Sequence, residues 1–197
     1  MSVKINYKTN LRIKSSSNLI LFSDENFNIS LLKKHFLSKE YSFILDLLKT
    51  RDIKKKIQFF DISSKKKIVL VSLKKNLKAF EAENLGAKFY DQFKDLKQNE
   101  YYLNSETVSN QLKNLVGYFL HGLRLKSYSF EKYKSKKNKK NISITVFGKN
   151  KPSVKDQLKF KSIEEGTFYT RDLVSEPGNI CIQMNIPKEY IHSESLD

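Results

Sequence analysis

The sequence predicts a layered α/β domain, in which helices cover a largely buried sheet, followed by one connecting helix. Short apolar segments typical of strands alternate along the chain with longer segments whose apolar residues recur at helical spacing. Hydrophobic residues make up 39% of the 197 residues and aromatic residues 12%, which suits a folded protein. We therefore expect one domain over residues 1–150 and a linker helix region over residues 151–179.

The first half of the chain contains four predicted strands and one predicted helix. Residues 3–7 (VKINY) alternate in polarity, and residues 18–24 (NLILFSD) end at polar turn residues, so both predict strands. From residue 28 to residue 52, apolar side chains fall on one helical face. Residues 57–63 (IQFFDIS) and 66–73 (KKIVLVSL) form the clearest strand pair, because only a short polar turn separates them.

The second half of the domain continues the alternation. Residues 77–96 have helical spacing, with Gly86 as an expected weak point inside the helix. Residues 99–104 (NEYYLN) and 142–148 (ISITVFG) predict two further strands. Between them, residues 106–126 have the most regular apolar stripe of the chain and predict its strongest helix.

The linker helix is expected over residues 162–177. Ser162 and Glu165 have the spacing of a capping box, and Pro177 is a stop signal at the other end. Glu164 and Glu165 are interpreted as acidic residues near the helix N-terminus, on a solvated face.

The chain is strongly basic, with a net charge of +16, and 33 of its 37 basic residues are lysine. Residues 132–141 (KYKSKKNKKN) concentrate this charge and predict an exposed loop. An alternative is contact with a polyanion such as nucleic acid, because lysine ammonium groups displace counterions from phosphate. The candidate contact residues are Lys136, Lys137, Lys139 and Lys140.

The sequence contains no recognisable catalytic constellation, so we assign no catalytic, cofactor-binding or metal-binding residue. The glycines never fall in the spacings that cradle phosphate groups. His35, His121 and His192 lie far apart, and a zinc site would need partners that they do not have. His121 lies beside the stripe of the strongest predicted helix and is expected to be structural.

Several features point to the cytoplasm. The single cysteine, Cys181, cannot form an internal disulfide, which fits a reducing compartment. No apolar run reaches the roughly 18–20 residues needed to cross a bilayer. The N-terminal segment also lacks the small-residue cleavage site of a secretory signal.

Two stretches of the chain resemble the leucyl aminopeptidase family. Residues 117–140 (GYFLHGLRLKSYSFEKYKSKKNKK) are similar to a family segment in which a helix ends in a leucine-rich turn before a lysine cluster. Residues 166–179 (GTFYTRDLVSEPGN) are similar to the family's linker helix, with the pattern Arg-Asp-Leu-Val-x-x-Pro-x-Asn. The matching residues are Arg171, Asp172, Leu173, Val174, Pro177 and Asn179.

This resemblance implies a macro-domain-like N-terminal domain, a linker helix and then a larger catalytic domain. That catalytic domain would hold two divalent metals, zinc or manganese, that activate water to remove N-terminal amino acids from peptides. Family members are cytosolic and typically hexameric. The family's metal ligands have no counterpart here, so we expect a noncatalytic fragment, inactive alone, whose partner is its own missing catalytic domain.

After residue 179 the sequence departs from the family pattern. For one allowed choice of codons, inserting one base after codon 180 would convert the ICIQMNI run (residues 180–186) into Ile-Leu-Tyr-Pro-Asp-Glu-Tyr, which restores that pattern. We therefore expect residues 180–197 to be a non-native tail produced by a frameshift. The alternative is a short protein with a divergent C-terminus, acting as a stand-alone basic binding module for nucleic acid or another polyanion.

Overall fold

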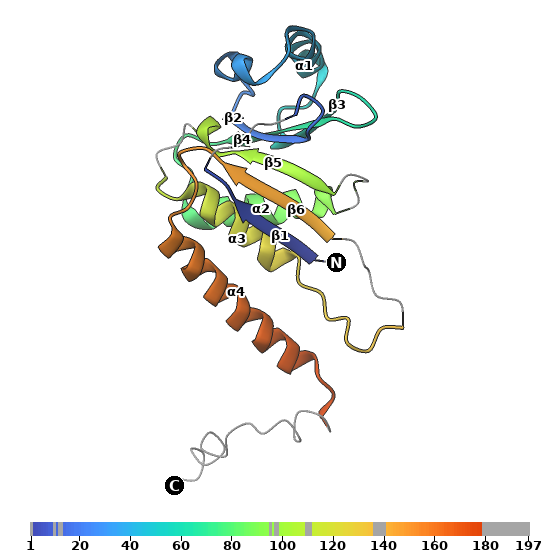
Figure 1. Cartoon of the computed structure of the whole chain (residues 1–197), viewed down its shortest axis with the longest axis vertical. Helices are drawn as coiled ribbons and strands as arrows, with labels where there is room; N and C mark the ends of the chain where they lie inside the picture. Colours follow the sequence, from blue (N-terminus) through green and yellow to red (C-terminus); the bar gives the residue numbers. More distant parts are fainter. Residues whose placement is uncertain are drawn as a thin grey trace.

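The computed structural model contains one six-stranded sheet with helices on both faces (Figure 1). The strand order is β1-β6-β5-β2-β4-β3, and all neighbouring strands run parallel except β3 and β4. The predicted α/β fold class is therefore confirmed. The structure describes residues 2–9, 11, 14–94, 96, 99–108, 112–135 and 141–178.

All six predicted strand segments form strands, with shifts of one or two residues at their ends. They are β1 (Ser2–Tyr7), β2 (Leu19–Asp24), β3 (Ile57–Asp61), β4 (Lys67–Leu73), β5 (Glu100–Asn104) and β6 (Asn141–Phe147). The segments expected to pair, β3 and β4, form an antiparallel ladder in which Ile57 lies opposite Val71. Val3 of β1 lies opposite Ile142 of β6.

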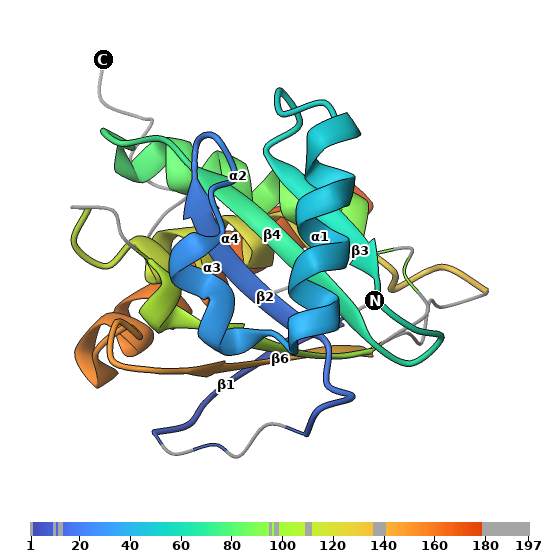
Figure 2. The ribbon, with the colours of Figure 1, turned by 90° about the horizontal axis from the view of Figure 1, so that it is seen from above.

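The helices form layers on the two faces of the sheet. They are α1 (Ser38–Thr50), α2 (Ala79–Phe93), α3 (Leu115–Lys126) and α4 (Val154–Ser175), with short 3-10 segments η1 (Ser30–His35) and η2 (Ser105–Thr107). α2 and α3 lie together on one face, and α1 lies over β4 and β3 on the other (Figure 2). α4 packs on α3 and continues away from the sheet (Figure 1).

Alternating side chains of the strands build one core on each face of the sheet. The core under α2 and α3 is rich in aromatic rings, and Phe119 makes edge contacts with Phe22 and Phe89 at centroid distances of 5.4 Å. The core under α1 is smaller and includes Ile44 and Phe60, both completely buried. The buried apolar alternation of the strands is therefore what orients the helices on both faces.

Two glycines allow α2 and α3 to pack with their backbones in contact. A Cβ atom on Gly86 would lie 1.9 Å from the Phe119 carbonyl oxygen, and one on Gly122 would lie 2.0 Å from that of Glu83. The expectation that Gly86 is only a weak point in its helix is therefore incomplete. The missing side chains are a requirement of the helix contact.

Two helices begin later than predicted. The segment 28–52 is divided, because the backbone is extended at Phe36 and Leu37, and the Glu40 carboxylate accepts the Leu37 amide at the start of α1. The segment 106–126 becomes helical only at Leu115. Before it, Thr107 Oγ1 accepts the Phe22 amide at 2.9 Å, which ties this part of the chain to β2 instead.

The linker helix begins earlier than predicted. α4 starts at Val154, where Ser153 Oγ accepts the Asp156 amide at 3.2 Å and caps the helix. The predicted capping box at Ser162 and Glu165 is wrong, since both residues lie inside the helix. The error arose because two Ser-x-x-acidic patterns occur in this region, and the true cap uses aspartate rather than glutamate.

Candidate functional site

The candidate functional site is the junction between α3 and α4. Its centre is Glu164, which is 7% exposed and lies between two side chains of α3. His121 Nδ1 lies 3.1 Å from one carboxylate oxygen, and Arg124 Nε donates to the other at 3.2 Å. Because a carboxylate can only accept, His121 Nδ1 is the donor in this contact. The interpretation of Glu164 as a solvated acidic residue is wrong.

Arg124 extends this junction to the edge of the sheet. Its Nη1 donates to the Val3 carbonyl of β1, and its guanidinium lies 5.8 Å from the ring centroid of Phe168 in α4. The neighbouring Tyr7 ring is largely enclosed. Its burial, with a smaller contribution from the negative charge of Glu164, raises the pKa of Tyr7 to about 12. One arginine therefore connects the sheet, α3 and α4.

The family motif residues form a second set of contacts further along α4. Arg171 Nη1 donates to the Leu125 carbonyl at 2.7 Å, and its guanidinium lies 5.4 Å from the Tyr128 ring centroid. The Tyr128 hydroxyl donates to Asp172 Oδ1 at 2.8 Å, and its ring packs on Phe168. Arg171 and Asp172 thus hold the segment that leaves α3 against the side of α4.

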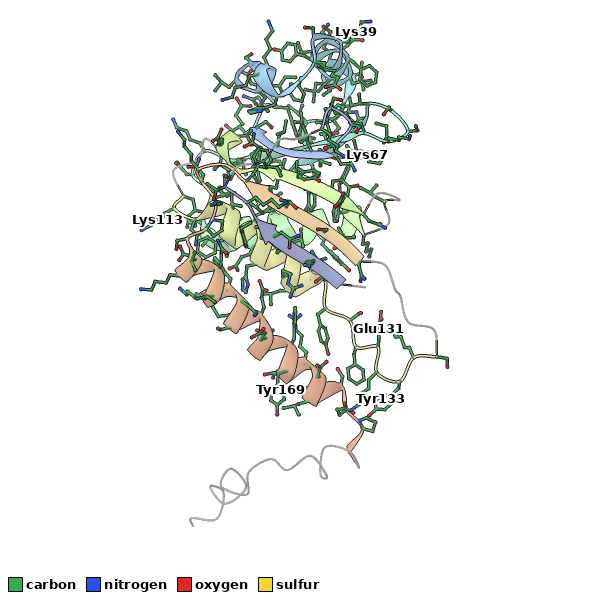
Figure 3. All side chains as sticks on the ribbon, in the orientation of Figure 1. Lys39, Lys67, Lys113, Glu131, Tyr133 and Tyr169 are labelled. Atoms are coloured by element: carbon green, nitrogen blue, oxygen red, sulfur yellow. The ribbon has the colours of Figure 1, made fainter. Side chains whose placement is uncertain are left out.

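The contact continues to the C-terminal end of α4, where Glu176, the residue that follows the helix, accepts from two residues. Lys132 Nζ donates at 2.6 Å, and the Tyr133 hydroxyl also donates. Tyr133 lies beside the end of α4 (Figure 3). These hydrogen bonds lower the pKa of Glu176 and raise the pKa of Lys132. Sequence reasoning missed Glu176, because it lies just after the helix, and its partners are more than 40 residues away in the sequence.

The remaining predicted motif residues are placed differently. Leu173 is half-buried and lines a cavity of about 390 Å³, which is also lined by Phe130 and Tyr169. Val174 is 83% exposed, and Pro177 follows the helix on the surface. Asn179, Cys181, His192 and the four lysines Lys136, Lys137, Lys139 and Lys140 lie outside the described residues.

The junction has the chemistry of a structural contact. Within the described ranges, no three His, Cys, Asp or Glu side chains come together in a way that could hold a metal ion. The described residues therefore do not fit a two-metal centre. In the same part of the chain, every helix is too short or too polar to cross a bilayer.

Removing the Arg171 side chain tests the second set of contacts. We expect Arg171→Ala to lower the free energy of unfolding by about 1–2 kcal/mol, because the Leu125 carbonyl loses a charged donor. The change should appear in urea unfolding followed by circular dichroism. Lys161→Ala is the control, since its ion pair with Glu165 is exposed and should contribute less than about 0.5 kcal/mol. Equal effects of both substitutions would contradict this role.

His35 should make the stability of the chain depend on pH. Burial of the imidazole, and then the charge of Lys34, hold the pKa of His35 below its ordinary value of 6.5. The stabilising effect of the neutral ring is therefore complete above pH 6.5 and decreases as the pH falls through that value toward the folded-state pKa. We expect His35→Gln to reduce the loss of urea stability on acidification. Identical pH profiles for the two proteins would exclude this contribution.

Known proteins resemble this chain in sequence and in fold. No protein-family model matches the chain. A probable cytosol aminopeptidase of Clostridium perfringens is 31% identical over 173 residues, covering 83% of this chain and 34% of the relative. One from Phytoplasma australiense is 37% identical over 76 residues, covering 37% of this chain and 15% of the relative. The chain thus spans about a third or less of the length of these curated relatives.

A solved structure of a tomato leucine aminopeptidase mutant has the same fold. It superimposes with a TM-score of 0.68 at 18% identity, and the match covers 91% of this chain and 39% of the tomato chain. The resemblance to the leucyl aminopeptidase family is confirmed. The sheet and its flanking helices match the N-terminal domain of leucine aminopeptidase, and the match covers most of this chain.

Proposed function

We propose that this chain is the noncatalytic N-terminal domain and linker helix of a cytosolic leucyl aminopeptidase. The main support is that the similarity covers 83% of the chain but only 34% of the bacterial relative. The parent enzyme would use two divalent metals, zinc or manganese, to remove N-terminal amino acids from peptides. Its ligands would come from the catalytic domain, since the described residues of this chain do not fit such a centre.

In this proposal α4 is the connection between the two domains. One side of the helix is held to the α/β domain by Glu164, Arg171 and Glu176. Apolar side chains of the helix remain exposed to solvent, among them Tyr169 at 63% and Val174 at 83% exposure. Exposed apolar side chains of this size are stabilised when they are covered. We assign them to the contact with the catalytic domain, in a parent that assembles as a homohexamer in the cytoplasm.

Two activity measurements test the proposal. The purified chain, incubated with zinc or manganese, should release no leucine from leucine p-nitroanilide, and release would overturn the noncatalytic role. A chimera that joins residues 1–178 of this chain to the catalytic part of the Clostridium perfringens aminopeptidase should hydrolyse this substrate. The same chimera carrying Tyr169→Asp and Val174→Asp should lose activity or assembly. An inactive unsubstituted chimera that is folded would count against the domain assignment.

The basic binding module stays an alternative. Its support is the net charge of +16, which attracts any polyanion without specificity. The four lysines proposed for it lie outside the described residues. Neutralising all four should abolish a steep salt dependence of DNA binding if this alternative holds.

A further inference from the structure

The first strand of the sheet has an open edge. β1 lies at the end of the strand order and, among the strands that the structure describes, pairs with β6 alone. Backbone groups of successive residues in a strand point to opposite edges. The Lys8 amide donates to Val146 of β6 at 2.9 Å, so the even-numbered residues of this segment face β6. The N–H and C=O groups of Val3, Ile5 and Tyr7 therefore point away from the sheet.

Most of these outward groups have no partner in the described part of the chain. Arg124 donates to the Val3 carbonyl, but no described residue bonds the outward backbone groups of Ile5 or Tyr7. An edge of this kind is a template for another strand unless it is covered or blocked. The Val3 carbonyl is one such covered group, and the rest of the edge is available.

A groove runs beside this edge because the helix layer is wider than the sheet. α4 lies beyond α3 on the same side of the sheet and passes the β1 edge (Figure 1). The space between β1, α3 and the first half of α4 is a cavity of about 570 Å³. Two apolar side chains of α4 line it while remaining exposed, Val154 at 72% and Leu158 at 60%. The groove therefore has the form of an unfilled strand position. Its lining combines apolar side chains with charged ones, among them Arg124 and Glu164 of the junction.

We propose that the β1 edge and this groove bind an extended segment of another protein as a seventh strand of the sheet. Main-chain hydrogen bonds to Ile5 and Tyr7 would hold the segment, and its side chains would select it. This role goes beyond the aminopeptidase assignment and does not depend on it.

The two faces of β1 define the chemistry of the segment. Toward the helices, Val3 is buried and the exposed side chains of Val154 and Leu158 line the groove, so every second side chain of the segment is apolar. On the opposite face, Lys4 and Lys8 are exposed, so the intervening side chains are acidic and pair with them across the strands. A second copy of the chain fits poorly, because each copy carries a net charge of +16 and would place lysine opposite lysine.

A labelled peptide tests the proposal on the full chain. The probe is a nine-residue, fluorescein-labelled peptide of alternating valine and aspartate, and binding is measured by fluorescence anisotropy. Ile5→Pro removes an outward N–H while leaving the β6 ladder intact, and should weaken binding about tenfold or more. Leu158→Asp should weaken it similarly. Val174→Asp is the matched control, since this residue of α4 is also exposed but lies outside the groove and should change nothing.

Further measurements separate edge pairing from other modes of binding. A peptide of the same sequence with every backbone nitrogen methylated should not bind, and one with lysine in place of aspartate should bind more weakly. Bound probe should slow hydrogen exchange at the Ile5 and Tyr7 amides. Circular dichroism establishes whether each variant is folded. If Ile5→Pro unfolds the chain, the binding measured with Leu158→Asp tests the groove instead. Equal binding by the methylated peptide would overturn the proposal. The proposal would also be overturned if the unliganded chain were a dimer and Ile5→Pro dissociated that dimer.

Discussion

Replacing Gly122 by alanine is expected to destabilise the domain by about 3 kcal/mol or more, because the new methyl group enters the backbone of α2. The added Cβ would lie 2.0 Å from the Glu83 carbonyl oxygen, a distance that no rotation of a side chain can relieve. The two helices would have to move apart. That movement would also loosen the aromatic core between them, including the contact of Phe89 with Phe119. Urea unfolding followed by circular dichroism would measure the loss.

Gly166 provides the matched control for this substitution. It lies in the middle of α4, and a Cβ atom there would meet nothing within 4 Å. Gly166→Ala should therefore stabilise the chain by about 0.5–1 kcal/mol through its higher helix propensity. The two substitutions add the same methyl group to a helical glycine and are expected to have opposite signs. If Gly122→Ala proved as stable as the unchanged chain, the close packing of α2 on α3 would be wrong.

Removing the Glu164 carboxylate is expected to destabilise the junction by about 3 kcal/mol, because a partly buried guanidinium loses its counterion. In Glu164→Ala, His121 and Arg124 both lose their partner, and the side chain of Arg124 is only 28% exposed. Glu164→Gln keeps one acceptor oxygen and should lose roughly half as much. We also expect faster proteolysis within α4, since this carboxylate attaches the helix to α3.

The neighbouring Glu165 is the control for this prediction. It is paired with Lys161 on the surface, with both side chains more than 60% exposed. Glu165→Ala should change the free energy of unfolding by less than about 0.5 kcal/mol. Similar effects of the substitutions at positions 164 and 165 would contradict the assignment of Glu164 to the centre of the junction. Thermal unfolding at two salt concentrations would add a check, because the exposed pair is screened and the buried one is not.

The strands were predictable because the apolar pattern that marks each strand lies in neighbouring residues of the sequence. Residues 68–71 (IVLV) are a continuous apolar run inside β4, which is buried on both faces of the sheet, so composition alone identifies it. Residues 57–63 lie one short turn away, and neighbours of this kind pair with each other. The motif residues Arg171 and Asp172 were also found from sequence, through the family pattern. What they contact was not, since Leu125 and Tyr128 lie more than 40 residues away.

The helix ends were harder to predict because competing contacts decide them. Residues 106–114 continue an apolar stripe, yet Thr107 bonds the Phe22 amide and Asn114 adopts a left-handed conformation, with φ of 63°. α4 has the opposite difficulty. It packs on α3 along one line and leaves much of its surface exposed, so its apolar residues follow no strong helical period. The start at Val154 therefore depended on a single cap at Ser153.

The sequence alone determined the order of strands and helices, the two-sided burial of the sheet and the resemblance to leucyl aminopeptidases. These follow from the spacing of apolar residues and from a short motif, which are properties of neighbouring positions. The tertiary structure alone decided that Glu164 is buried, that Gly86 and Gly122 carry the contact of α2 with α3, and that β1 has an open edge. Each of these depends on groups far apart in the chain meeting in space, where distance, not sequence separation, sets the energy.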